Sequence, residues 1–136
     1  NNHIESIENK AFDGLPRLHT LKLIHNQFKT LPSTLFAQLT NIKKLFITHT
    51  SLSRINGSMF KNNTQLQHLI LNDNKISEIE SNFINNLHHL ELLMLKDNIC
   101  VDKDFVRQSN RNILSDVFMI LMFKCFDNYS SQNNSQ

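Results

Sequence analysis

The chain is 136 residues long, which suits a single domain, and its formal net charge is +2 with histidine counted as neutral. So small a charge, without a basic run, does not indicate binding to nucleic acid or to an anionic membrane surface. The chain has only 2 Gly and no nucleophile motif or pair of catalytic carboxylates, which argues against a phosphate-binding loop and against catalysis. We therefore expect neither an enzyme nor a cofactor.

A pattern of apolar residues recurs every 24 residues through most of the chain. Full copies begin at Leu18, Ile42, Leu66 and Leu90, and the chain opens on the end of a further copy, so we expect it to be a fragment or a processed product. Apolar and polar residues alternate early in each copy, which is typical of a half-buried strand. No copy can bury its apolar side chains alone, so we expect stacked copies with their strands in one parallel sheet.

A second set of apolar positions lines the return segment of each copy. We expect the following residues to point inward: Ile7, Leu31, Ile55 and Ile79; Phe12, Phe36, Phe60 and Ile84; Leu15, Leu39 and Leu87.

A column of asparagines follows the strands, where a carboxamide can satisfy buried backbone groups of neighbouring turns; it consists of Asn2, Asn26, Asn74 and Asn98. Thr50 interrupts this column, and Asn63 stands where other copies have leucine. We therefore expect the second full copy to be the loosest.

These positions spell the pattern LxxLxLxxNxLxxLpxxxFxxLxx over residues 1–100, which resembles the typical class of leucine-rich repeat proteins. The resemblance implies an α/β solenoid: a curved, right-handed superhelix with a parallel sheet on its concave face and irregular or short helical segments on its convex face. The class resembles extracellular proteins such as Toll-like receptor ectodomains and matrix proteoglycans. It therefore implies a secreted protein or the ectodomain of a membrane receptor.

The periodicity stops after Cys100, and we expect residues 101–126 to form a helical C-terminal cap. Asp104 is a candidate N-cap for a short helical turn, and Asn112 for a longer helix. Four residues have the spacing of one helical face: Leu114, Phe118, Leu121 and Cys125. The apolar run at 117–123 is far shorter than the roughly 20 residues of a membrane span. We expect the polar residues 127–136 to be a disordered tail.

A helix laid across the last copy would bring Cys125 toward Cys100, so a disulfide between them is the sharper hypothesis. The alternative is two unrelated buried thiols. The arrangement resembles the C-terminal flanks of secreted insect leucine-rich repeat proteins, including mosquito immune proteins. It departs from the four-cysteine flank common in vertebrate members.

The acceptor pattern for N-linked glycans, N-x-S/T, occurs at Asn56, Asn62, Asn128 and Asn133. Such triplets arise by chance in an asparagine-rich chain, but here none falls on the predicted strand face. Asn56 and Asn62 fall on the return side of the second full copy, where a bulky glycan would leave the concave sheet open for contact. We therefore expect glycosylation at one or both of these two residues.

Residues one repeat apart lie side by side on neighbouring strands, and the column between the two strand leucines is Lys22, Phe46, Ile70 and Met94. The repeat pattern does not require an apolar residue at this position, so we expect these side chains to face solvent. Four neighbouring residues extend this column: Ile24, Lys44, His68 and Leu92. Together the eight residues predict a partner-binding surface that has an apolar centre and a charged border. The alternative is that single exposed apolar residues are common, and that the cap covers Leu92 and Met94.

A further column just beyond the strands holds His25, His49, Asp73 and Asp97. Imidazole and carboxylate groups can bind metal, but one ladder on a flat sheet gives poor tetrahedral geometry, so we expect no metal site. A pH-sensitive contact is a second, lesser hypothesis for these residues.

Taken with the resemblance, these features predict an extracellular recognition module. It would bind a partner protein or a microbial surface molecule through its concave face, with innate immunity as the implied setting. The alternatives are an enzyme inhibitor and a structural component of matrix or adhesion complexes. The sequence leaves the oligomeric state open.

Overall fold

The computed structural model describes residues 3–109, 112–121 and 124–126. The predicted tail at 127–136, with Asn128 and Asn133, lies outside these residues, as does Asn2. A five-stranded sheet contains, in spatial order, β1 (Thr20–Ile24), β2 (Lys44–Thr48), β4 (His68–Ile70), β6 (Leu92–Met94) and β7 (Asp104–Val106). Two short strands, β3 (Arg54–Ile55) and β5 (Glu78–Ile79), pair on the return side, and the helix α1 spans Ile113–Leu121.

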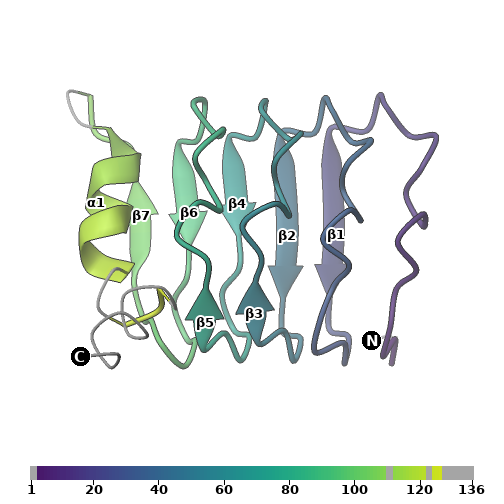
Figure 1. The fold of residues 1–136 in the computed structure, drawn as a ribbon, viewed down its shortest axis with the longest axis horizontal. Helices are drawn as coiled ribbons and strands as arrows, with labels where there is room; N and C mark the ends of the chain where they lie inside the picture. The colour runs from purple at the N-terminus through teal and green to yellow at the C-terminus, as the bar shows by residue number, and fades with distance from the viewer. Residues whose placement is uncertain (1–2, 110–111, 122–123, 127–136) are drawn as a thin grey trace, which may run out of the picture.

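The register of the large sheet follows the sequence repeat. Strand β1 pairs in parallel with β2, β2 with β4 and β4 with β6, so that Leu45 lies beside Leu69, and Leu69 beside Leu93. These three leucines have no exposed surface, because one side of every strand packs against the return segments. The predicted solenoid is therefore confirmed, and Figure 1 shows its strands following one another along the long axis.

The return side consists of turns and the small β3–β5 sheet, which the sequence did not predict. Its inward positions form stacks between copies: the Phe12 and Phe36 rings lie 6.2 Å apart, and the Phe36 and Phe60 rings 6.1 Å apart, both nearly parallel. Leu15 departs from the expectation that it points inward, because 44% of its surface is exposed. Its counterparts in later copies, Leu39 and Leu87, are buried.

The asparagine column bonds one coil to the next. Asn74 donates from Nδ2 to the carbonyls of Ile47 and Leu71, and Asn98 donates in the same way to Leu71 and Leu95. Each side chain therefore joins its own coil to the preceding one.

The two substitutions in the second full copy are both accommodated. The Thr50 hydroxyl donates to Asn74 and accepts from the amide of Leu52, and the fully buried Asn63 donates to the carbonyls of Phe36 and Leu39. Oδ1 of Asn63 is buried without a hydrogen-bond partner. That this copy is the loosest stays a prediction.

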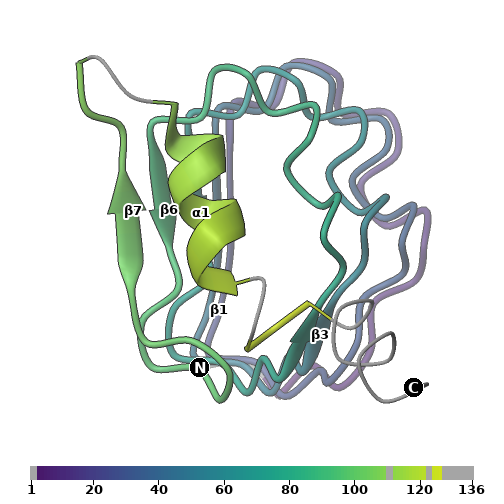
Figure 2. The ribbon, with the colours of Figure 1, turned by 60° about the vertical axis from the view of Figure 1, so that its left-hand side comes forward.

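The cap differs from its prediction in two respects. Asp104 does not begin a helical turn: it begins β7, which pairs antiparallel with β6, while its carboxylate accepts the amides of Leu95 and Lys96. The predicted cap of the longer helix is confirmed, because Oδ1 of Asn112 accepts the amide of Leu114 at 3.0 Å. Figure 2 shows α1 lying across the open end of the solenoid, on the core side of β7.

The buried face of α1 is also rotated from the one predicted. It consists of Ile113, Val117 and Leu121, whereas Phe118 is 40% exposed. The helix ends at Leu121, so Cys125 lies beyond it and cannot continue a helical face. Tertiary packing, which orients the helix against the last coil, therefore selects a different stripe of its apolar surface.

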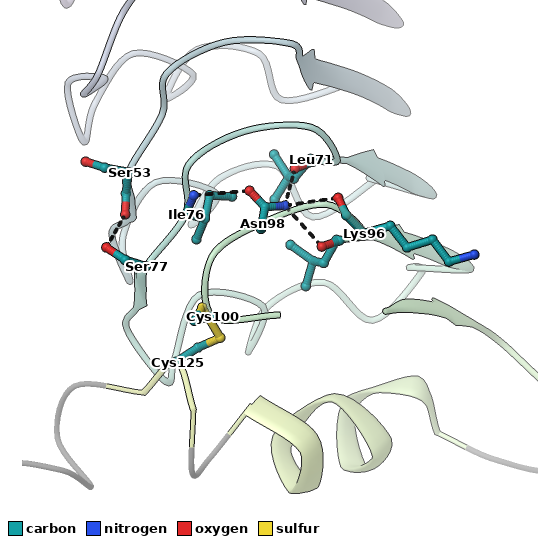
Figure 3. The surroundings of a disulfide bond; sticks show 9 residues. Ser53, Leu71, Ile76, Ser77, Lys96, Asn98, Cys100 and Cys125 are labelled. Carbon is teal, nitrogen blue, oxygen red and sulfur yellow. Dashed lines mark hydrogen bonds between the residues drawn. A yellow bond between two sulfur atoms is a disulfide. The ribbon is translucent and has the colours of Figure 1, made fainter. Parts of the chain in front are cut away.

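Cys100 and Cys125 form a disulfide, with their Cα atoms 5.3 Å apart (Figure 3). The amide of Ile79 also donates to the carbonyl of Cys125, so the segment after α1 is tied to the return side as well as to the last coil. The predicted pairing is thus present in the structure. None of the described helices has the length and apolar character needed to cross a membrane.

Candidate functional site

The side of the large sheet turned away from the core, called here the concave face, carries the predicted central column. Lys22 lies beside Phe46, Phe46 beside Ile70, and Ile70 beside Met94. The column ends at Asp104, which β7 places opposite Met94. Unlike the strand leucines, Phe46, Ile70 and Met94 do not belong to the hydrophobic core. Their apolar character is therefore not explained by packing inside the solenoid.

Exposure within the central column is uneven. Phe46 and Met94 are half-buried, but Ile70 is only 6% exposed, so the expectation that it faces solvent is wrong. The reason is local: larger side chains on both neighbouring strands flank this β-branched residue at cross-strand distance. Ile70 therefore forms the floor of the surface, and Phe46 and Met94 form its accessible apolar part.

The Lys22 ammonium group lies 5.2 Å from the centre of the Phe46 ring. At this distance a cation is attracted by the ring face, with a contribution of about 0.5–1 kcal/mol at an exposed site. Lys22 and Phe46 thus form one unit that presents both an apolar surface and a positive charge.

A second column runs parallel to the first. Lys44, His68 and Leu92 lie side by side, and β7 adds Val106 next to Leu92. Leu92 is half-buried and Val106 is 63% exposed, so the apolar surface continues onto the cap. Of the predicted cap, α1 does not cover Leu92 and Met94, because it lies on the opposite side of the sheet (Figure 2), whereas β7 lies beside both residues. Sequence reasoning missed Val106 because nothing in the repeat predicted β7.

Charge changes sign along the concave face. Basic residues border β1 and β2, namely Lys22, Lys43 and Lys44, whereas Glu91, Asp97 and Asp104 border β6 and β7. The acidic border is partly paired within the chain: Glu91 lies 4.0 Å from His68, and Asp104 lies 4.0 Å from Lys96. The exposed lysines at the other end, like the exposed Asp97, have no ion pair with another described residue and are available to a partner. Ile24, at the end of β1, is half-buried on the same face.

The histidine–aspartate column forms the turn that follows each strand. Its four residues adopt the left-handed conformation, with φ values of 59° for His25, 54° for His49, 57° for Asp73 and 59° for Asp97. Asp and His are among the non-glycine residues that enter this region more often than most, which is the sequence signal that could have revealed it.

The neighbours in this column also touch one another. The His25 and His49 rings lie 4.6 Å apart, and Nε2 of His49 is 3.5 Å from the Asp73 carboxylate. In the parts of the chain that the structure describes, no three such side chains are grouped as metal ligands. The left-handed turns account for the residue types in this column, and the pH-sensitive contact stays a prediction.

The two described glycan acceptors lie on the return side, as predicted. Asn62 is exposed, and its Nδ2 donates to the carbonyl of Ala37 at 3.0 Å. Asn56 is half-buried and precedes Gly57, which lies against the side chain of Asn82. A second amide ladder, missed by the sequence, joins the coils here: Gln38, Asn62 and Asn86 each bond to the backbone of the preceding coil.

This chain belongs to the leucine-rich repeat family, because the profile of the BspA type leucine rich repeat region matches residues 1–118 with six copies. Two solved structures of the Drosophila Toll–Spatzle complex, described as a molecular hub in development and innate immunity, have a similar fold.

One of them has a TM-score of 0.71 and 24% identity and covers 88% of this chain and 15% of that chain. The other, a glycosylated form, has a TM-score of 0.70 and 28% identity and covers 71% of this chain and 13% of that chain. This chain therefore spans a small part of the length of either relative. A comparison with curated protein sequences gives no match.

Proposed function

We propose that this chain is an extracellular recognition module that binds a partner protein through its concave face. The observation that carries the proposal is the central column: Phe46 and Met94 are partly exposed on the sheet and contribute nothing to the core. Apolar groups at the middle of a polar surface are characteristic of contact sites between proteins. A binding role also agrees with the leucine-rich repeat family, whose folds are typically binding modules.

The surface has the anatomy of a small interface. Phe46, Met94 and Leu92 form an apolar centre over Ile70, and Lys22, Lys44 and His68 border it. Residues at such a centre usually carry most of the binding energy, whereas charges at the border guide the encounter. Since the lysines lie over β1 and β2, a partner should present acidic residues at that end.

Two findings support the extracellular setting. The Cys100–Cys125 bond supports an oxidising compartment, because disulfides persist there whereas cytosolic thiols are kept reduced. The fold is also similar to that of Toll in its complex with Spatzle, which is why we place the recognition in innate immunity. Glycans at Asn62 or Asn56 would lie away from the concave face and leave it accessible.

The proposal can be tested by screening the disulfide-bonded protein against an array of secreted proteins and receptor ectodomains. Phe46→Ser and Leu92→Ser should each weaken binding of the partner found by about tenfold or more. Ile99→Ser is the matched control, because Ile99 is an apolar residue that is 68% exposed outside the concave face. Equal binding by all three variants would place the interface elsewhere. Binding of many fibrous matrix proteins without dependence on Phe46 would favour a structural role instead.

A further inference from the structure

The outer edge of β7 is open in the structure. Strand β7 is last in the order of the sheet, and β6 occupies its other edge. The amide of Arg107 donates to the carbonyl of Glu91 at 2.7 Å. In an antiparallel ladder, residues with backbone groups directed toward the partner strand alternate with residues whose groups point away from it. The backbone groups of Asp104 and Val106 therefore point away from β6. No other strand among the described residues pairs with them. Such an edge is a template for pairing with another chain.

A groove of about 460 Å³ runs between this edge and α1, lined by residues that include Val106, Ile113, Asp116, Met119 and Ile120. Met119 is 69% exposed and Ile120 36%, although both are large apolar residues. They contribute nothing to the face with which α1 covers the core, which consists of Ile113, Val117 and Leu121. The groove therefore combines an open strand edge with an apolar wall that the fold leaves uncovered.

The carboxylate of Asp116 adds a charge to the groove. The carboxylate of Asp104, the other acidic residue of the groove, already accepts hydrogen bonds from two backbone amides. It also lies 4.0 Å from the ammonium group of Lys96. Asp116 has no ion pair with any described residue, and it sits on the same helix as Met119 and Ile120. A cation is the complementary group for this position.

We propose that this groove is a second docking site, which takes an extended segment of a partner protein as an added strand on β7. The open backbone groups require a β-conformation, and the side chains of a strand alternate, so every second residue would face α1. Those residues should be apolar where they meet Met119 and Ile120, and Lys or Arg where they meet Asp116.

The chain's own residues 127–136 match this description poorly. Their sequence, DNYSSQNNSQ, contains neither Lys nor Arg and has Tyr129 as its only large apolar residue. The groove shares Asp104 and Val106 of β7 with the edge of the concave face, but its other wall, α1, lies on the core side of the sheet (Figure 2). The inference therefore stands independently of the proposed function.

Selection of random short peptides, displayed on phage, on the immobilised disulfide-bonded protein tests the proposal. Counter-selection uses Met119→Asp, which changes an exposed side chain and should leave the melting temperature unchanged. Enriched peptides should alternate apolar and polar residues and contain Lys or Arg. As free peptides they should bind Met119→Asp at least about tenfold more weakly than the unmodified protein, and Asp116→Asn about threefold more weakly.

Two further measurements keep the result specific. Amide hydrogen exchange at Asp104 and Val106 should slow when a selected peptide is added, and a proline in the middle of that peptide should abolish binding. Phe46→Ser and Ile99→Ser should bind the peptide normally. The proposal is overturned if enriched peptides bind Met119→Asp equally well, if the proline version still binds, or if no peptide is enriched. Deletion of residues 127–136 that strengthens peptide binding, or a dimer that Met119→Asp dissociates, would assign the groove to the chain itself and also overturn it.

Discussion

Asn74 accepts two hydrogen bonds from Thr50 through one atom: its Oδ1 receives both the backbone amide and the side-chain hydroxyl of that residue. Thr50 stands at the position where other copies have asparagine, one repeat before Asn74. The interruption of the column is thus bridged by the following asparagine. The buried Asn74 side chain therefore makes three hydrogen bonds to the second copy, two with Thr50 and one with the carbonyl of Ile47.

We therefore expect Asn74→Ala to destabilise the fold by about 3 kcal/mol, because it leaves the Ile47 carbonyl and the Thr50 amide and hydroxyl without the partners that Asn74 provides. Denaturant unfolding followed by circular dichroism measures the change. Asn85→Ala is the control, since Asn85 is exposed on the return side and should cost little. Equal stability of the two variants would contradict a structural role for the column.

Removing the disulfide should lower the free energy of unfolding by about 3 kcal/mol, the value expected for a loop of this length. The variant Cys100→Ala/Cys125→Ala, compared with the oxidised protein in thermal unfolding, gives the difference, and reduction of the unmodified chain should reproduce it. Intact-mass measurement after alkylation without reductant is the direct check on the bond. Two alkylated thiols in protein secreted by cells would show that it does not form.

Serine substitutions of one core residue and two residues of the central column should differ in their effect on stability, because the three side chains differ in burial. Leu69→Ser should destabilise by more than about 3 kcal/mol, because Leu69 is fully buried in the core. Ile70→Ser should cost about 1–3 kcal/mol, because Ile70 is 6% exposed on the opposite side of the strand. Phe46→Ser should cost less than about 1 kcal/mol, because its ring is half-buried. Melting temperatures in any other order would mean that the column belongs to the core.

Of the two described glycan acceptors, we expect Asn62 to be the more fully used in protein secreted by eukaryotic cells. Its side chain is exposed, and the carboxamide nitrogen keeps one hydrogen for the Ala37 carbonyl after the other is replaced by a sugar. Peptide mass mapping before and after glycosidase treatment measures occupancy at both sites. Thr64→Ala should remove the glycan from Asn62 while leaving the asparagine in place. A mass shift confined to the Asn56 peptide, or none at all, would refute the expectation.

The repeat pattern by itself was enough to determine the solenoid. Leu45, Leu69 and Leu93 must share a side of the sheet, because the side-chain period of a strand is two residues and the copies have equal length. The same equality puts Lys22, Phe46, Ile70 and Met94 in one column, so the candidate surface could be named from the sequence. The N-cap at Asn112 was also local information, carried by one side chain and a nearby amide.

Only the tertiary structure decided what happens where the repeat ends. Asp104 looked like a helix cap, but the edge of β6 offered its neighbours a strand partner, and pairing with a sheet edge overrides a weak local preference. The apolar residues of α1 could support several faces, and docking against the last coil selected Ile113, Val117 and Leu121. Ile70 became nearly buried for the same kind of reason. Its exposure depends on the size of side chains on two other strands, a quantity that no single stretch of sequence contains.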